Sequence, residues 1–275
     1  MKNSAQLLFP ALLLFFAACK EQPIIIPDPS LNISGRTVLV EEVTGVRCQN
    51  CPLGTQTLVA LQQQYGKDKL VVVSIHAAGN FSVPYPSSQV DFRSTETQEL
   101  ANYIGALFGF PTAAIDRRLL PNEPSIFLTG HTRWGGEVAQ DLQKDASMAI
   151  LLENTYNAGT RGLDVKVGLL PNQTLAGEYR LTVLITQDSI IDPQLNGVTL
   201  VQNYVHRHVV RDVVSAPSGD PILEALEPGV LVNKTYNVVL PDTWDAKHCS
   251  VVAYVHRGLA NDKEVLQANE KHVTE

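Results

Sequence analysis

The segment that decides the fold is Thr37–Pro52, which reads TVLVEEVTGVRCQNCP. Its first part, residues 37–44, is rich in β-branched residues and is typical of a strand. The pair Cys48 and Cys51 follows, and the apolar residues after it recur at the spacing of one helix face up to Tyr65, which predicts a helix over residues 48–65. A Cys-x-x-Cys pair that follows a strand and opens a helix is typical of a redox-active dithiol.

The residues that follow extend an alternation of strands and helices. Residues 69–75 (KLVVVSI) form a continuous apolar run of the kind found in buried parallel strands, and residues 76–94 predict a long loop. Further elements are predicted as a helix at 95–107, strands at 113–116 and 125–128, and a helix at 132–145. This order predicts an α/β layer fold for residues 37–146.

After about Ser147 the apolar pattern changes to a period of two residues. Residues 163–169 and 179–186 alternate apolar with mostly polar side chains. Further strand candidates, separated by turn signals, are residues 199–214, 235–240, 250–257 and 263–268. Strands at this spacing predict an all-β sandwich over residues 147–275.

The N-terminal residues have the features of a targeting signal. Lys2 precedes an apolar stretch of 12 residues from Leu7 to Ala18, short of the ~20 residues that span a bilayer. Residues 1–18 are therefore predicted to be a signal peptide. Ala17 and Ala18 before Cys19 resemble a bacterial lipobox, which implies acylation of Cys19 and attachment to a membrane. The alternative is a plain secretory signal with an incidental cysteine. Residues 19–36, with three prolines, predict a stiff lipidated tether.

The position of the cysteine pair suggests how it would react. The N-terminal end of a helix favours a thiolate on Cys48, and Arg47 would add a positive charge beside it. Cys48 would attack a substrate sulfur, and Cys51 would resolve the mixed disulfide. Two alternatives stay open. The pair could be a structural disulfide, which closes only a four-residue loop, or half of a zinc site that lacks a second ligand pair.

Composition and charge exclude several other functions. The 275-residue chain is 44% hydrophobic and carries a net charge of −7, with no cluster of basic residues, so nucleic acid is not an expected partner.

We expect no cofactor and no metal. His206 and His208 lie two apart on a predicted strand and so would share a face, where His248, Cys249 or His256 could complete a metal site. Ordinary packing histidines are the alternative, and Cys249 is expected to be a buried thiol.

Residues 37–145 resemble the thioredoxin superfamily. Cys48-x-x-Cys51 matches its active-site motif, and Pro111 in Gly109-Phe110-Pro111-Thr112 stands where that family keeps a cis-proline facing the dithiol. Glu42 occupies the place of its buried carboxylate, which could accept the Cys51 proton. Glu42 could instead be a solvated strand residue, with Glu41 the inward one. The tryptophan usual before the first cysteine is replaced by Val46-Arg47, and the loop at 76–94 lies between the dithiol and Pro111 in sequence.

A second resemblance extends over nearly the whole mature chain. The chain is similar to the outer-membrane-protein-28-related lipoproteins in four stretches, namely Glu41–Pro52, Gly109–Thr112, Tyr204–Arg211 and Val265–Ala268. That family implies a thioredoxin-like domain joined to a β-sandwich, a location at the outer membrane, and an adhesin-like role.

Two functions follow as expectations. The first is a lipid-anchored outer-membrane protein whose dithiol, at Cys48 and Cys51, exchanges disulfides with envelope proteins, assisted by Pro111 and Glu42. The second is a non-catalytic adhesin-like or accessory protein, with an outer-membrane protein as partner, in which Cys48–Cys51 is a structural disulfide. The sequence leaves open whether the protein faces the periplasm or the cell surface.

Overall fold

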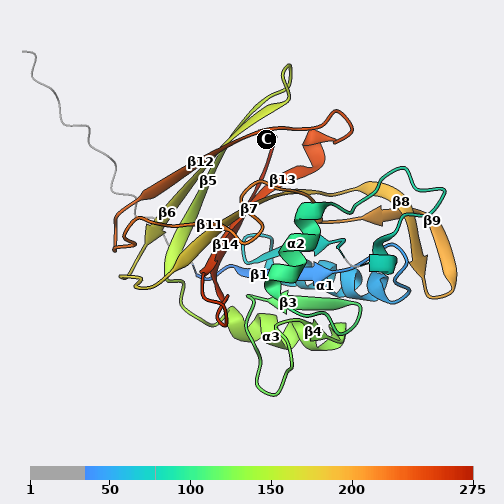
Figure 1. Ribbon diagram of the computed structural model, residues 1–275, viewed down its shortest axis with the longest axis horizontal. Helices are drawn as coiled ribbons and strands as arrows, with labels where there is room; N and C mark the ends of the chain where they lie inside the picture. Colours follow the sequence, from blue (N-terminus) through green and yellow to red (C-terminus); the bar gives the residue numbers. More distant parts are fainter. Residues whose placement is uncertain (1–34, 78, 275) are drawn as a thin grey trace, which may run out of the picture. The chain divides into compact units, whose positions relative to one another are not determined.

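A computed structural model describes residues 35–77 and 79–274 of the chain (Figure 1). The predicted signal peptide, the lipidation site Cys19 and nearly all of the predicted tether lie outside these residues. The helices are α1 (Cys51–Tyr65), α2 (Thr95–Ile104) and α3 (Trp134–Asp141), with 3-10 helices η1 (Gly79–Ser82), η2 (His131–Arg133) and η3 (Ala246–His248). The strands are β1 (Val38–Val43), β2 (Leu70–Ile75), β3 (Thr112–Ile115), β4 (Leu128–Thr129), β5 (Met148–Asn157), β6 (Gly162–Pro171), β7 (Tyr179–Gln187), β8 (Ile190–Asn196), β9 (Thr199–His206), β10 (Val209–Val213), β11 (Asp220–Pro221), β12 (Val232–Val239), β13 (Cys249–Arg257) and β14 (Val265–His272).

Within the described residues, the largest sheet has nine strands and crosses the predicted boundary at residue 147. Its order is β14-β13-β7-β10-β2-β1-β3-β4, with β11 paired to β7. β1 runs parallel to β2, and β3 runs antiparallel to β1. The connection between the two halves is a parallel contact in which Val209 of β10 pairs with Ser74 of β2. The α/β segment and the later strands therefore share one continuous sheet.

Both faces of this sheet are covered. α1 and α3 pack on one face, where Leu58 and Trp134 join Val38 and Val40 in an apolar core. α2 packs on the other face, with a core that includes Leu100 and Ile104 and extends from Leu39 and Val71 to Leu184, Val210 and Val252 of the later strands. All six residues of β1 are buried for this reason.

The later strands form two facing sheets. β12, β6 and β5 make a three-stranded sheet whose inner side chains, such as Val165 and Val167, pack against Val183 and Val251 of the large sheet. The described part of the chain is thus mostly β-sheet with few helices, as expected for a β-sandwich. β5 was not predicted, because apolar residues at successive positions of its first half conceal the alternation.

Several predicted boundaries differ from the structure. The first helix begins at Cys51 rather than Cys48, because Cys48 lies in a turn in which its N–H donates to the Gly45 carbonyl at 3.0 Å. The predicted strand over residues 199–214 is two strands, β9 and β10. The extended conformation is interrupted at His208, where φ is +54°. As a result β9 pairs with β8, while β10 joins the large sheet. β8 itself was not predicted.

A buried ionic cluster joins the two halves of the large sheet. The Arg117 guanidinium donates two hydrogen bonds of 2.7 Å to the Glu41 carboxylate and one of 2.6 Å to the Tyr254 hydroxyl. The Tyr254 hydroxyl also donates to Glu41 at 2.9 Å. All three side chains are fully buried. Because Glu41 lies on β1 and Tyr254 on β13, the cluster fixes strands that are far apart in sequence.

Arg117→Met should lower the free energy of unfolding by about 3–5 kcal/mol, because it leaves the Glu41 charge buried without its counterion. Arg93→Met is the matched control, since Arg93 pairs with Asp91 at the surface and a pair of that kind contributes about 1 kcal/mol or less. Denaturant unfolding of the oxidised protein measures both losses. Equal losses for the two variants would contradict a stabilising role for the cluster.

Candidate active site around Cys48 and Cys51

The two cysteines form a disulfide at the start of α1, with Cα atoms 5.4 Å apart. Cys48 lies in the turn before the helix, and the Cys51 N–H donates to the Cys48 carbonyl at 3.3 Å. Pro52 follows in the first turn of α1, where the missing N–H of proline leaves no hydrogen bond unmade. Both cysteines are buried, with exposed fractions of 3% for Cys48 and 1% for Cys51.

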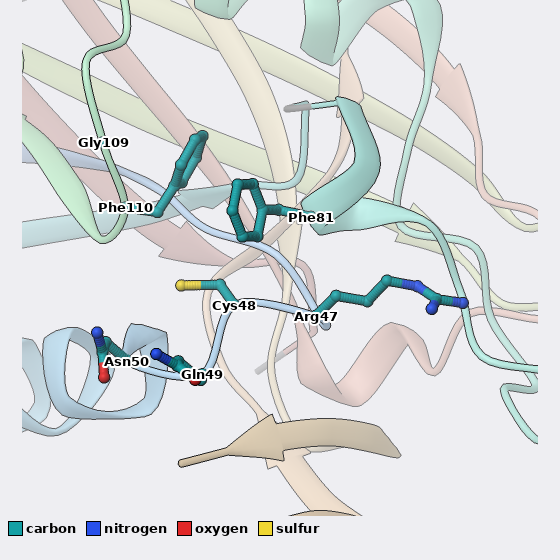
Figure 2. Close-up of a pocket in the computed structure, with 7 residues that line it drawn as sticks. All are labelled: Arg47, Cys48, Gln49, Asn50, Phe81, Gly109 and Phe110. Carbon is teal, nitrogen blue, oxygen red and sulfur yellow. The ribbon is translucent and has the colours of Figure 1, made fainter. Parts of the chain in front are cut away.

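A groove opens beside Cys48. Its cavity of about 420 Å³ is lined by Arg47, Cys48, Gln49, Asn50, Phe81, Gly109 and Phe110. The Cys48 sulfur points beneath the rings of Phe81 and Phe110 (Figure 2), whose centroids are 5.1 Å apart. A second cavity of about 530 Å³ shares Asn50, Gly109 and Phe110 with the first and continues past Leu53 and Phe108. Phe108 is 65% exposed. Phe110 thus lines both cavities, and Cys48 lines the first of them.

The Phe110–Pro111 peptide bond is cis and precedes β3. Pro111 packs against α1 at Gly54, where an added Cβ would lie 3.0 Å from the Pro111 Cβ and 2.7 Å from the Glu42 Oε1. Helix α1, Pro111 and the Glu42 carboxyl therefore meet at Gly54, which has no side chain.

Glu42 is the carboxyl on the α1 side of the sheet. Its Oε2 accepts hydrogen bonds from Ser74 Oγ at 3.2 Å and from Thr55 Oγ1 at 3.4 Å, and its Oε1 has no hydrogen-bond partner among the described residues. Complete burial raises the pKa of this carboxyl from 4.5 to about 8, so it holds a proton at neutral pH. Glu41, on the opposite face, is ionically paired with Arg117. Neither glutamate is solvated, because both faces of the sheet are covered.

The Arg47 guanidinium does not lie beside the disulfide, contrary to the expectation from sequence. It donates to the carbonyls of Val83 and Pro84 at 2.6 and 2.8 Å and stacks over the Tyr85 ring. Figure 2 shows the side chain directed away from Cys48. The loop after β2 therefore binds the Arg47 guanidinium, which was expected to stabilise the Cys48 thiolate.

His206 and His208 do not share a strand face. His206 is the last residue of β9, and its ring packs against Phe92 and His76. His208 lies between β9 and β10, and its Nδ1 is 3.4 Å from the Asp188 carboxylate. Among the described residues, no group of three His, Cys, Asp or Glu side chains is arranged to hold a metal ion.

The remaining candidates for that metal site lie in separate surroundings. His256 bonds to Thr182 at 3.1 Å, and His248 lies next to Asp245. Cys249 is a free and buried thiol, and burial raises the pKa of this thiol to about 11.

Sequence reasoning missed the residues that surround the disulfide from distant segments. Phe81 comes from the loop after β2. The β8–β9 hairpin contributes Gln194 and Leu195, which hydrogen-bond to the turn at residues 45–48. No local pattern marks these residues, because their partners lie tens to more than a hundred positions away in the chain.

Gly54→Ala should destabilise the protein by about 1–3 kcal/mol, because the added Cβ overpacks the contact with Glu42 and Pro111. Gly136→Ala in α3 is the matched control. An added Cβ there meets nothing within 4 Å, so this variant should gain up to about 1 kcal/mol from helix propensity. Thermal or denaturant unfolding measures both effects, and a gain for both variants would contradict the close packing.

Glu42→Gln should remove a pH dependence of stability. The folded protein holds the Glu42 proton up to about pH 8, whereas the unfolded chain releases it near pH 4.5. Stability of the wild type therefore falls as pH rises through this interval. The variant should gain about 1.4 kcal/mol relative to wild type for each pH unit between pH 5 and 8. Denaturant unfolding across that range tests this, and Glu99→Gln on the exposed face of α2 controls for the loss of a carboxyl. Parallel pH profiles for wild type and Glu42→Gln would show that Glu42 is already ionised.

The fold is shared with solved structures at low sequence identity. HBP35 of Porphyromonas gingivalis has a TM-score of 0.72 at 16% identity, with 88% of this chain and 76% of that chain covered. A protein from Agrobacterium tumefaciens has a TM-score of 0.51 at 14% identity, with 88% and 96% covered. A domain of the outer membrane lipoprotein Omp28 from Porphyromonas gingivalis has 16% identity, covers 46% of this chain and 88% of its own, and its TM-score is only 0.34. No curated protein matches the chain in sequence.

The family comparison is more specific. The family described as Outer membrane protein Omp28 matches residues 97–275, well over half of the chain. The match includes cis-Pro111, the β8–β9 hairpin and the sandwich strands, while the cysteine pair lies before it. In the described part of the chain, no helix is both long and apolar enough to cross a bilayer. On the sequence match over residues 97–275, this chain belongs to the Omp28 family of outer membrane proteins.

Proposed function

We propose that the protein is a lipid-anchored thiol–disulfide exchange protein of the outer membrane, with Cys48 and Cys51 as its redox-active pair. Residues 37–146 would be a thioredoxin-like domain and residues 147–275 a sandwich that docks envelope proteins. The observation that carries the proposal is the meeting of three features at the start of α1. The Cys48–Cys51 disulfide, the cis peptide before Pro111 and the buried Glu42 carboxyl all contact this one turn of helix.

The strand order supports the thioredoxin-like assignment. β1, α1 and β2 form a parallel unit, and β3 and β4 add antiparallel strands on the other side of β1, in the order β2-β1-β3-β4. The cysteines follow the central strand β1. A reactive pair at that place lies beyond the carboxyl end of β1, beside the groove lined by Phe81 and Phe110 in which a partner protein would bind.

The exchange step can be written with the groups present. A thiolate of a substrate attacks Cys48 Sγ, the Cys48–Cys51 bond breaks, and Cys51 leaves as a thiolate. The neutral Glu42 carboxyl supplies the proton that Cys51 takes up. A second substrate thiolate then attacks the substrate sulfur of the mixed disulfide and releases Cys48 as a thiolate, which takes up a proton from solvent, as Glu42 does in turn. The substrate is oxidised to a disulfide while the Cys48–Cys51 pair is reduced to a dithiol.

The location follows from the family and the N-terminal sequence together. Omp28 family membership supports the outer membrane. Removal of residues 1–18 as a signal peptide and acylation of Cys19, including palmitate, would anchor the chain there through its tether. The groove at Cys48 would then be held near the membrane surface, where its substrates would be envelope proteins.

A second candidate function is favoured by the burial of both cysteines. With exposed fractions of 3% and 1%, the sulfurs are poorly accessible to a large partner, as expected for a structural disulfide. The protein would then be an adhesin-like or accessory lipoprotein that binds an outer-membrane protein through the sandwich.

The reduction potential of the Cys48–Cys51 pair separates the two functions. A mature form beginning after Cys19 is equilibrated with thiol buffers, and the fraction of reduced pair is measured. We expect a potential between about −120 and −270 mV for an exchange protein, and below about −300 mV for an inert structural bridge.

Cys51→Ala should trap mixed disulfides with envelope proteins, because its free Cys48 thiolate can attack an oxidised substrate, which is the reverse of the exchange above, and no second cysteine resolves the product. Cys48→Ala is the matched control and should trap none. Non-reducing electrophoresis of intact cells reveals the adducts. Equal amounts of adduct in the two variants would contradict Cys48 as the cysteine that bonds to the substrate.

A further inference from the structure

The β8–β9 hairpin lies against the turn that carries Cys48. In the described part of the chain, its two strands pair with each other as a separate two-stranded sheet. The outer edge of β8 faces the cysteine turn. The Leu195 N–H donates to the Val46 carbonyl at 2.8 Å, and the Gly197 N–H donates to the Gln49 carbonyl at 2.9 Å. The hairpin thus satisfies backbone carbonyls on both sides of Cys48.

Gln194 completes this contact with its side chain. It is buried, with 3% of its surface exposed. Its amide nitrogen donates to the carbonyls of Gly45 and Cys48, each at 3.2 Å, and to that of Leu195 at 2.9 Å. The Gly45 carbonyl also accepts the Cys48 N–H, the bond that closes the turn. One carboxamide therefore bridges the start of the turn and its cysteine.

These contacts order the backbone on which the disulfide depends. Cys48 has no helix to hold it, since α1 begins only at Cys51. Buried carbonyls need donors, and a donor lost from such a place leaves the carbonyl unsatisfied. The hairpin belongs to the sandwich half of the chain, more than 140 positions after the turn, so that half supplies donors to the cysteine turn.

We propose that Gln194 is a positioning residue for the Cys48–Cys51 pair, and that through it the sandwich sets the reduction potential of the pair. The proposal rests on the proposed redox function and deepens it. The hydrogen bonds of the Gln194 amide nitrogen end on backbone carbonyls rather than on a reacting sulfur. Gln194 acts by holding the Gly45–Cys48 turn in the conformation that keeps the Cys48 sulfur within bonding reach of Cys51.

The direction in which the reduction potential changes follows from the oxidised protein, in which the Gln194 hydrogen bonds to Gly45 and Cys48 are made. Loss of the Gln194 donors loosens the turn, so the two thiols meet less often in the geometry that closes the disulfide. The oxidised form is then weakened more than the dithiol, whose sulfurs need no fixed separation. The pair becomes easier to reduce, and its potential becomes less negative.

Gln194→Met tests the proposal, because methionine keeps the length of the side chain and has no donor. Reduced and oxidised fractions are measured in thiol buffers at fixed pH. We expect the equilibrium constant for reduction to rise about tenfold, which for a two-electron couple is about 30 mV. Gln187→Met is the matched control, since Gln187 is also buried but bonds to Arg211. It should leave the potential at the wild-type value.

The outcomes separate the two proposals, because the potential belongs to the cysteine pair whether or not the protein exchanges disulfides. A shift of the reduction potential in Gln194→Met, with none in Gln187→Met, supports the positioning role. This holds even if Cys51→Ala traps no substrate and the exchange function fails. An unchanged potential in folded Gln194→Met overturns it, even if exchange is observed. If Gln194→Met does not fold, Gln194→Leu, which is smaller and also has no hydrogen-bond donor, decides the question by the same measurement.

Discussion

The pairing of β10 with β2 is the contact on which the rest of the structure depends. The Ser74 N–H donates to the His208 carbonyl at 2.8 Å, and Val209 pairs with Ser74 in parallel register. This contact turns two groups of strands into a single sheet. α2 can therefore cover residues from both, and the Tyr254 hydroxyl of β13 can donate directly to Glu41 of β1 while it accepts from Arg117. The chain between β7 and β10 is also brought beside the cysteine turn, where it forms the β8–β9 hairpin.

Burial on both faces of the sheet explains the different states of two adjacent glutamates. Glu41 and Glu42 point to opposite faces, and each is removed from water. On one face Arg117 supplies a positive charge and forms a buried ion pair with Glu41. On the other face the donors are the hydroxyls of Ser74 and Thr55, so desolvation dominates and Glu42 keeps its proton. One sheet thus holds a structural carboxylate and, beside the disulfide, a carboxyl that can give or take a proton.

The sequence predicted the parts of this arrangement that arise from local patterns. Apolar runs and alternation located β1, β2, β6 and β7, and helical spacing located α1. The misses have physical causes. β5 begins with successive apolar residues that mask its period, and β8 begins just after Ser189, which has a positive φ of 61° and so bends the chain. Arg47 was expected beside Cys48, but two backbone carbonyls and an aromatic ring in the next loop bind it more completely than a single sulfur could.

The sequence by itself determined the cysteine pair, the strand before it and the proline that follows Phe110. These depend on neighbours within a few residues: a three-residue spacing brings two sulfurs within bonding reach, and a strand or helix period is visible in one short segment. Only the tertiary structure decided which groups surround the pair and which partner each buried side chain meets. Phe81, Gln194 and Arg117 reach their partners across 29 to 149 positions, and such contacts depend on how the elements pack. Local periodicity constrains the face that a side chain occupies, but the identity of its partner is decided by the packing of the whole sheet.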